Sequence, residues 1–227
     1  MKTPVDDPPV ERGPAVTVAL VAANLLAFLW QLNVGPPGNP VELRIQLSAL
    51  IGGVIPYEVV TFRDIGPRDI VPPPFTILTS MFLHGSWAHL GGNLAFLWVF
   101  GPSVERALGH GRYLLFYLAS GVAAALAHTL LAMAVGDPFV PMVGASGAIA
   151  GVLAAYLVLA PRAPRRSYPS TGFFIGVWFV LQVVYAFLGG SGAGVAFFAH
   201  VGGFVLGWIL AMAMARNRPG EDPPVPA

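Results

Sequence analysis

The chain has 227 residues, of which 56% are hydrophobic and 10% are charged, and it contains no cysteine. A water-soluble domain carries about 25% charged residues, so this composition excludes a soluble globule and predicts a membrane protein. The lack of cysteine excludes disulfides, thiolate metal ligands and a thiol nucleophile. The net charge of +1 gives no basic footprint for nucleic acid, so the expected surroundings are the lipid bilayer.

Six apolar stretches are long enough, or nearly so, to cross a hydrocarbon core of about 30 Å, which takes about 20 residues. They are Ala15 to Val34, part of Phe75 to Phe100 (clearest after Trp87), Tyr113 to Val135, Pro141 to Ala160, Gly172 to Leu188, and Ala193 to Ala215. We therefore predict an all-α membrane protein, with a bundle of six transmembrane helices over residues 15–216.

A signal peptide is the competing interpretation of the first stretch, Ala15 to Val34. We favour a span, because the run is longer than a usual signal and lacks a small-x-small cleavage site. Residues 1–14 and 217–227 are rich in proline and acidic residues, and we predict disordered tails. Residues 35–74 are too many for a simple connection, so we predict a long, folded, interfacial first loop on the extracytoplasmic side.

Basic residues are unevenly distributed between the two sides of these stretches. Nine of the twelve Lys and Arg fall in the tails, in the second-to-third connection and in the fourth-to-fifth connection. The other three, Arg44, Arg63 and Arg68, lie in the first loop. The positive-inside rule then predicts a multi-pass protein of the cell membrane with both termini in the cytoplasm.

Polar residues inside apolar stretches are costly and are therefore candidates for function. The fourth stretch contains Ser146 and the sixth contains His200. Each is followed by a small-xxx-small pair, which lets membrane helices approach closely; the pairs are Gly147 with Gly151, and Gly203 with Gly207. His200 shares a helical face with its two glycines. If the fourth helix packs there, Ser146 and His200 come within hydrogen-bond distance.

Depth in the membrane gives a second argument for this pairing. We expect the fourth helix to begin near Pro141 and the sixth near Gly194, which places Ser146 and His200 five or six residues in, about 8 to 9 Å along the helix. A hydroxyl beside an imidazole is activated as a nucleophile. Only Asp137 is acidic between residues 105 and 221, so a Ser-His dyad is available rather than a buried triad.

His89 and Asn93 are spaced i, i+4 and therefore share a helix face in the second stretch. Both donate hydrogen bonds, and donors aimed at a developing oxyanion are often the largest catalytic term. Structural alternatives stay open, because a serine in a span often bonds back to its own helix and Asn93 could join two helices. We interpret His128 as such a bridge. We expect His84 at the membrane surface, with contact to the entrance of a site as the alternative.

Three motifs, in family order along the chain, resemble the rhomboid family of intramembrane serine proteases. They are HLGGN over residues 89–93, GASG over residues 144–147, and AHVGGFVLG over residues 199–207, which are similar to the family patterns H-x-x-x-N, G-x-S-G and A-H-x-x-G-x-x-x-G. The Val104-Glu105-Arg106 stretch with Gly109 is also similar to the family. The resemblance covers the chain from about Ile55 to Gly207.

The resemblance implies a role for each matching residue. Ser146 would attack the peptide carbonyl, His200 would act as general base and then acid, and His89, Asn93 and the Ser146 N–H would stabilise the oxyanion. Family members cut transmembrane or membrane-proximal segments of other proteins near the non-cytoplasmic face, with no metal or cofactor. The expected activity is therefore that of an intramembrane serine endopeptidase whose partners are transmembrane substrates; the oligomeric state is not predicted.

Two departures from the family pattern leave questions open. Some bacterial members have a tyrosine one turn after the serine that stacks on the catalytic histidine, whereas this chain has Ala150. Another group must therefore orient His200. The Trp-Arg pair of the first loop of some members is also absent.

Two alternative functions belong to other classes. A catalytically silent relative would bind membrane proteins and escort them, but such relatives lack the serine or the histidine. A small-solute transporter would show internal repeats and sites near the midplane of the membrane, and the sequence has no convincing repeat.

Overall fold

The computed structural model describes residues 13–65, 70–135, 137–159, 169–188 and 190–216. Within these residues the chain is helical, with one isolated bridge between Val54 and Met142. The long helices are α1 (Ala15–Gln31), α5 (Trp87–Leu108), α6 (His110–Val135), α7 (Ser146–Leu159), α8 (Pro169–Leu188) and α9 (Gly190–Arg216). The short ones are α2 (Val41–Gly52), α3 (Pro56–Thr61), α4 (Pro73–Thr79) and the 3-10 turn η1 (Ser80–Phe82). The all-α prediction is confirmed for this part of the chain.

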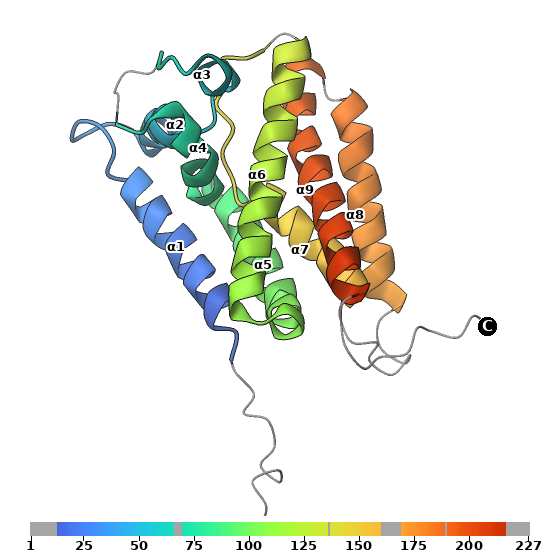
Figure 1. Ribbon diagram of the computed structural model, residues 1–227. Coiled ribbons are helices and arrows are strands. Elements are labelled where there is room, and N and C mark those ends of the chain that lie inside the picture. The colour runs from blue at the N-terminus through green and yellow to red at the C-terminus, as the bar shows by residue number, and fades with distance from the viewer. Residues whose placement is uncertain (1–12, 66–69, 136, 160–168, 189, 217–227) are drawn as a thin grey trace, which may run out of the picture.

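The long helices alternate in direction, so that α1 begins and α9 ends at the same end of the bundle (Figure 1). Two segments of the described chain, His110–Ala134 and Phe197–Arg216, are by length and composition alone long and apolar enough to cross a membrane. Shorter apolar helical segments cover Ala15–Gln31, Ser146–Leu159 and Thr171–Leu181. Most of the predicted tails and the basic connection over residues 160–168 lie outside the described residues.

One predicted helix start, at the point after Trp87 where the second apolar run is clearest, is confirmed, and one, near Pro141, is wrong. The second long helix begins only at Trp87, because Ser86 caps it by accepting the His89 backbone N–H at 3.1 Å, and Pro73–Thr79 is the separate helix α4. The fourth begins at Ser146 instead of Pro141, because residues 141–145 are extended and Met142 pairs with Val54. The extended segment before Ser146 is apolar, so hydropathy alone does not separate it from helix.

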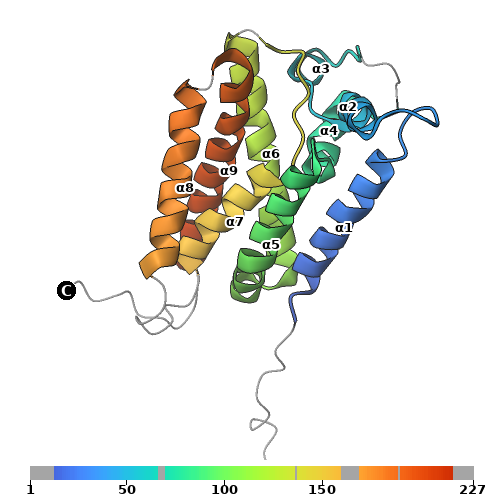
Figure 2. The same cartoon turned by 180° about the vertical axis from the view of Figure 1, so that it is seen from behind.

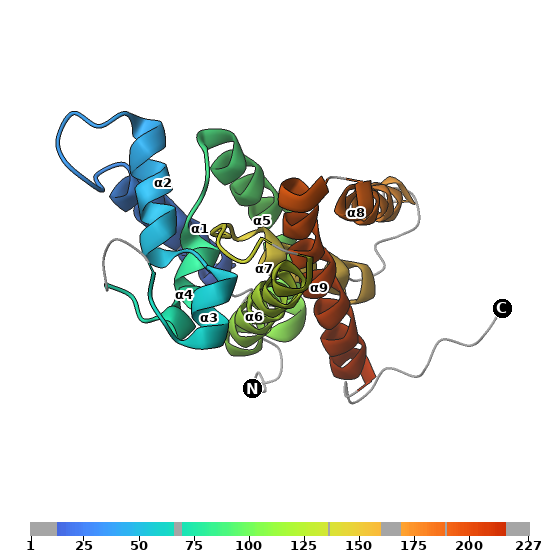
Figure 3. The same cartoon turned by 90° about the horizontal axis from the view of Figure 1, so that it is seen from above.

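Helix α7 is the centre of the bundle, and ten of its fourteen residues are buried. A helix that is apolar all round needs neighbours on every side, and Figure 2 shows it beside α5 and α9. Seen from above, α9 lies between α6 and α8 (Figure 3). Large apolar side chains face outward from the other long helices, for example Leu26, Val99, Leu115, Leu130 and Phe173.

The backbones of α7 and α9 touch through the predicted glycine pairs. A Cβ placed on Gly203 would overlap the carbonyl oxygen of Gly147, and a Cβ on Gly207 would overlap the Cα of Gly151. The predicted contact between the fourth and sixth long helices is therefore confirmed. Any larger residue at these positions would push the two helices apart.

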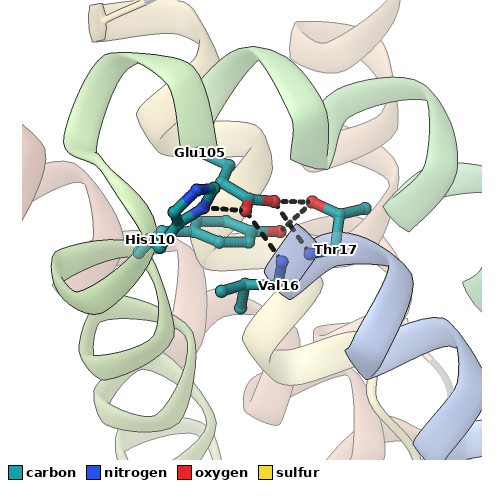
Figure 4. Close-up of polar contacts among 5 residues, drawn as sticks. Val16, Thr17, Glu105 and His110 are labelled. Atoms are coloured by element: carbon teal, nitrogen blue, oxygen red, sulfur yellow. Dashed lines mark hydrogen bonds and ion pairs between the residues drawn. The ribbon is translucent and has the colours of Figure 1, made fainter. Parts of the chain in front are cut away.

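A buried carboxylate near the end of α5 joins that helix to the starts of α1 and α6 (Figure 4). Glu105, only 2% exposed, accepts the backbone N–H groups of Val16 and Thr17, each at 2.8 Å, and the Thr17 hydroxyl at 2.7 Å. Its Oε1 also lies 2.6 Å from Nδ1 of His110. Pro14 precedes α1 and supplies no side-chain cap, so Glu105 caps that helix from a distant part of the chain.

Candidate active site

Ser146 is the first residue of α7, at the point where an extended segment turns into the helix. The turn needs Gly144, whose φ of 133° is unfavourable for any side chain. The Gly144 N–H donates to the Ser80 carbonyl at 2.8 Å, which ties the turn to η1. Because the first N–H groups of a helix have no partner within it, the serine hydroxyl sits beside free backbone donors and the positive end of the helix dipole.

His200 lies directly opposite Ser146, on α9. Its Nε2 is 2.7 Å from the Ser146 Oγ, a distance at which the hydroxyl donates to an unprotonated imidazole nitrogen. The close contact of α7 and α9 at Gly203 brings the two side chains together. This arrangement is the one that turns a weak hydroxyl into a nucleophile.

The depth argument for this pairing was wrong, although the two side chains do meet. Ser146 is at the very start of its helix, whereas α9 begins at Gly190, ten residues or about 15 Å before His200. Figure 1 shows α7 beginning part-way down the bundle, beside the middle of α9. The extended segment before Ser146 therefore carries the chain inward to the level of the histidine.

His89, in the first turn of α5, faces the same place. A Cβ built on Gly144 would lie 2.9 Å from the His89 Nε2 and 3.4 Å from the Ser146 Oγ, so the imidazole edge covers Gly144 beside the serine. The His89 Nδ1 accepts the Gly85 N–H at 3.4 Å. A neutral ring that accepts at Nδ1 carries its proton on Nε2, and this nitrogen is therefore a donor next to the serine.

Asn93 lies one turn further along α5 and is 7% exposed. Its side-chain nitrogen has no hydrogen-bond partner in the described structure, and an unpaired buried donor is costly. Asn93 does not line the cavity at the serine, whereas His89 does. The structure thus brings Ser146, His200 and His89 together and leaves Asn93 adjacent, with a donor to offer.

A cavity of about 190 Å³ opens between these residues. Its walls include Ser146, His89 and His200, and the apolar side chains of Met81, Met142 and Phe197. The space is mostly apolar, with a hydroxyl and two imidazoles converging on it. It accommodates a small side chain or a few atoms of an extended peptide rather than a large ligand.

His84, which we expect at the membrane surface, is fully buried within the protein. Its ring packs edge-on against His89, with ring centroids 5.2 Å apart. Gln31, at the end of α1, holds the His84 backbone from both sides, accepting its N–H at 2.8 Å and donating to its carbonyl at 3.0 Å. The sequence contained the signal, because Gln31 is a polar residue inside the first apolar stretch.

Two aromatic rings flank His200, and sequence reasoning missed both. Trp178 of α8 has its ring centroid 6.0 Å from that of the imidazole, and Phe197 of α9 lies at 6.0 Å from another side. Apolar stretches contain many aromatic residues, so no pattern singled out these two. Both rings contact the imidazole, whereas Ala150 on α7 is buried and has no ring that could do so.

The profile of the Rhomboid domain family matches residues 73–217, which include all four predicted site residues. The chain belongs to the rhomboid family. This rhomboid is 33% identical to the rhomboid protease GluP of Bacillus subtilis over 144 residues, covering 63% of this chain and 27% of GluP. It is 25% identical to the rhomboid protease AarA of Providencia stuartii over 221 residues, covering 88% of this chain and 72% of AarA.

A third relative is rhomboid protein 1, mitochondrial, of Saccharomyces cerevisiae, which is 30% identical over 168 residues, covering 66% of this rhomboid and 46% of the yeast protein. This rhomboid therefore spans less than half the length of two of these relatives. The family consists of membrane proteins, and the relatives that are named proteases are serine proteases of the rhomboid type.

Proposed function

We propose that this rhomboid is an intramembrane serine endopeptidase, with Ser146 as nucleophile and His200 as general base. The observation that carries the proposal is the 2.7 Å separation between the Ser146 Oγ and the His200 Nε2 inside a buried cavity. Membership of a family with named proteases supports the same reaction class. No cofactor or metal enters the proposed chemistry.

The reaction proceeds in two halves. His200 takes the proton of the Ser146 hydroxyl as its oxygen attacks the carbonyl carbon of the scissile peptide, and a tetrahedral oxyanion forms. His200 then gives that proton to the leaving amine, the C–N bond breaks, and an acyl-serine remains. Water, deprotonated by His200, attacks the ester, and the returning proton restores the serine hydroxyl.

The oxyanion is stabilised by donors that are already in place. The Nε2–H of His89 and the backbone N–H of Ser146 both lie at the serine, and Asn93 supplies a third donor from the same face of α5. Such preorganised donors act where water is excluded and need no reorganisation during the reaction. Asn93 has the more remote role, because it does not line the cavity.

The proposed setting is the cell membrane, crossed six times with both termini in the cytoplasm and the first loop outside. The alternating directions of the long helices and the apolar side chains on their outer faces support this topology. The cavity then lies toward the end of the bundle that carries α2, α3 and α4, the extracytoplasmic side. The substrates would be transmembrane segments of other proteins, cut in or near the bilayer.

The test compares wild type, Ser146→Ala and His200→Ala in liposomes that contain a transmembrane substrate, together with labelling by a serine-directed fluorophosphonate. Ser103→Ala is the matched control, because it removes a hydroxyl near the end of α5, whereas His89 and the site lie at the start of that helix. We expect cleavage and labelling in wild type and in the control, and neither in the two site variants. Equal cleavage by Ser146→Ala would overturn the assignment; tight substrate binding without turnover in wild type would favour the catalytically silent escort.

A further inference from the structure

The orientation of His200 matters for the proposed reaction, because its imidazole is the base that activates Ser146. A catalytic side chain must be held within about 0.5 Å and 10–20° of its productive geometry. On α7, the position one turn after Ser146 is Ala150, whose methyl group is completely buried and cannot cover an imidazole ring. The aromatic rings that contact the imidazole belong instead to Trp178 of α8 and Phe197 of α9.

Trp178 of α8 provides one of these contacts. The centroids of the indole and imidazole rings are 6.0 Å apart with an interplanar angle of 41°, and Phe197 meets the imidazole edge-on at 6.0 Å and 74°. Both distances fall in the range of about 4.5–7 Å in which aromatic rings attract one another. The two rings limit rotation of the imidazole from two directions.

Trp178 is itself held by its neighbours. Its ring lies 6.2 Å from that of Phe96 on α5, and Phe96 lies 6.3 Å from Phe174, one turn before Trp178 on α8. Phe96 is in turn 6.0 Å from Phe100. A row of aromatic rings thus runs from α5 across α8 to His200 on α9. Its contacts hold the indole in place beside the imidazole.

We propose that Trp178 is a positioning residue for His200, acting from α8 in place of a ring on α7. The inference rests on the proposed function, because it concerns the base of that reaction. With this role for Trp178, α8 supports the active site, although none of the described residues of α8 lines the cavity at the serine. Loss of the ring would leave substrate binding intact and lower the rate of serine activation.

The test uses Trp178→Leu and a matched control on the same pair of helices. Phe179, the next residue of α8, stacks on Phe204 of α9 with centroids 4.1 Å apart and an interplanar angle of 26°. Phe179→Leu therefore removes an aromatic contact between α8 and α9 that does not involve His200. Each variant is measured for kcat and KM on a transmembrane substrate, for the rate of fluorophosphonate labelling, and for Tm.

We expect Trp178→Leu to lower kcat and the labelling rate about 3- to 10-fold, the rate equivalent of one aromatic contact, with KM changed less than about twofold. Trp178→Phe keeps a ring and should restore most of the rate. Phe179→Leu should lower Tm about as much as Trp178→Leu does, but it should leave kcat within about twofold of wild type. If Trp178→Leu does not fold, Trp178→Met replaces it, because the flexible, unbranched methionine side chain adapts better to the space left by the indole.

Four outcomes would overturn the inference. Wild-type labelling and kcat in a folded Trp178→Leu or Trp178→Met would show that the ring does not orient the base. A higher rate in these variants would assign Trp178 to substrate access instead, and an equal loss of rate in Phe179→Leu would assign the effect to general packing. Wild type that is not labelled at Ser146 would overturn the proposed function, and this inference with it; the wild-type measurement separates the two cases.

Discussion

Replacing Glu105 by glutamine tests how much the carboxylate that caps α1 contributes to stability. Glu105 accepts the N–H groups of Val16 and Thr17 and the Thr17 hydroxyl, and it lies 2.6 Å from the His110 Nδ1. Glutamine keeps one oxygen, so one backbone N–H then faces an amide NH₂. An unsatisfied buried donor costs about 1–3 kcal/mol, and the lost charge at the helix N-terminus costs about 0.3–1 kcal/mol more.

The expected loss is therefore about 1–4 kcal/mol of the free energy of unfolding, or about 2–16 °C in Tm for a chain of this size. The measurement is thermal unfolding in detergent. Glu42→Gln is the control, because this carboxylate is exposed in the first turn of α2 and should shift the free energy by less than about 0.5 kcal/mol. A Glu105→Gln protein that melts with wild type would refute the capping argument.

Three further substitutions test the site and its support. Asn93→Ala should lower kcat by about 100- to 1,000-fold or less, because the other two oxyanion donors remain; a loss as complete as that of Ser146→Ala would give Asn93 another role. Gly203→Ala forces a methyl group onto the α7 backbone and should lower both Tm and labelling of the serine, whereas Gly111→Ala, which has open space around it, should do neither. Gln31→Leu leaves the buried N–H and carbonyl of His84 without their partner and should lower the free energy of unfolding by about 2–6 kcal/mol. An unchanged Tm in thermal unfolding would contradict a stabilising role for these two hydrogen bonds.

The sequence predicted the parts of the molecule that follow from local pattern. Long apolar runs indicated the long helices, and the glycine spacing after Ser146 and His200 indicated that α7 and α9 touch. Both are properties of one segment at a time, which hydropathy and helical periodicity describe well. The assignment of catalytic roles to these residues stays a prediction.

The features that depend on tertiary contacts were not predicted. The extended run before Ser146 is as apolar as a helix, and only its bridge to Val54 and the φ of Gly144 keep it out of α7. The ring of Trp178 looks like any aromatic side chain in an apolar stretch, and its contact with His200 depends on how α8 packs. Gln31 is recognisable in the sequence as a polar residue in an apolar stretch, but its hydrogen bonds to the His84 backbone depend on how α1 packs.

The carboxylate cap also bears on how the protein is made. The Thr17 N–H donates to the carboxylate of Glu105, which lies 88 residues further along the chain. At about 5–20 residues per second of translation, this interval is about 4–18 s. The helix α1 is therefore synthesised before the residue that caps it, and its first turn gains its partner only when α5 has been made.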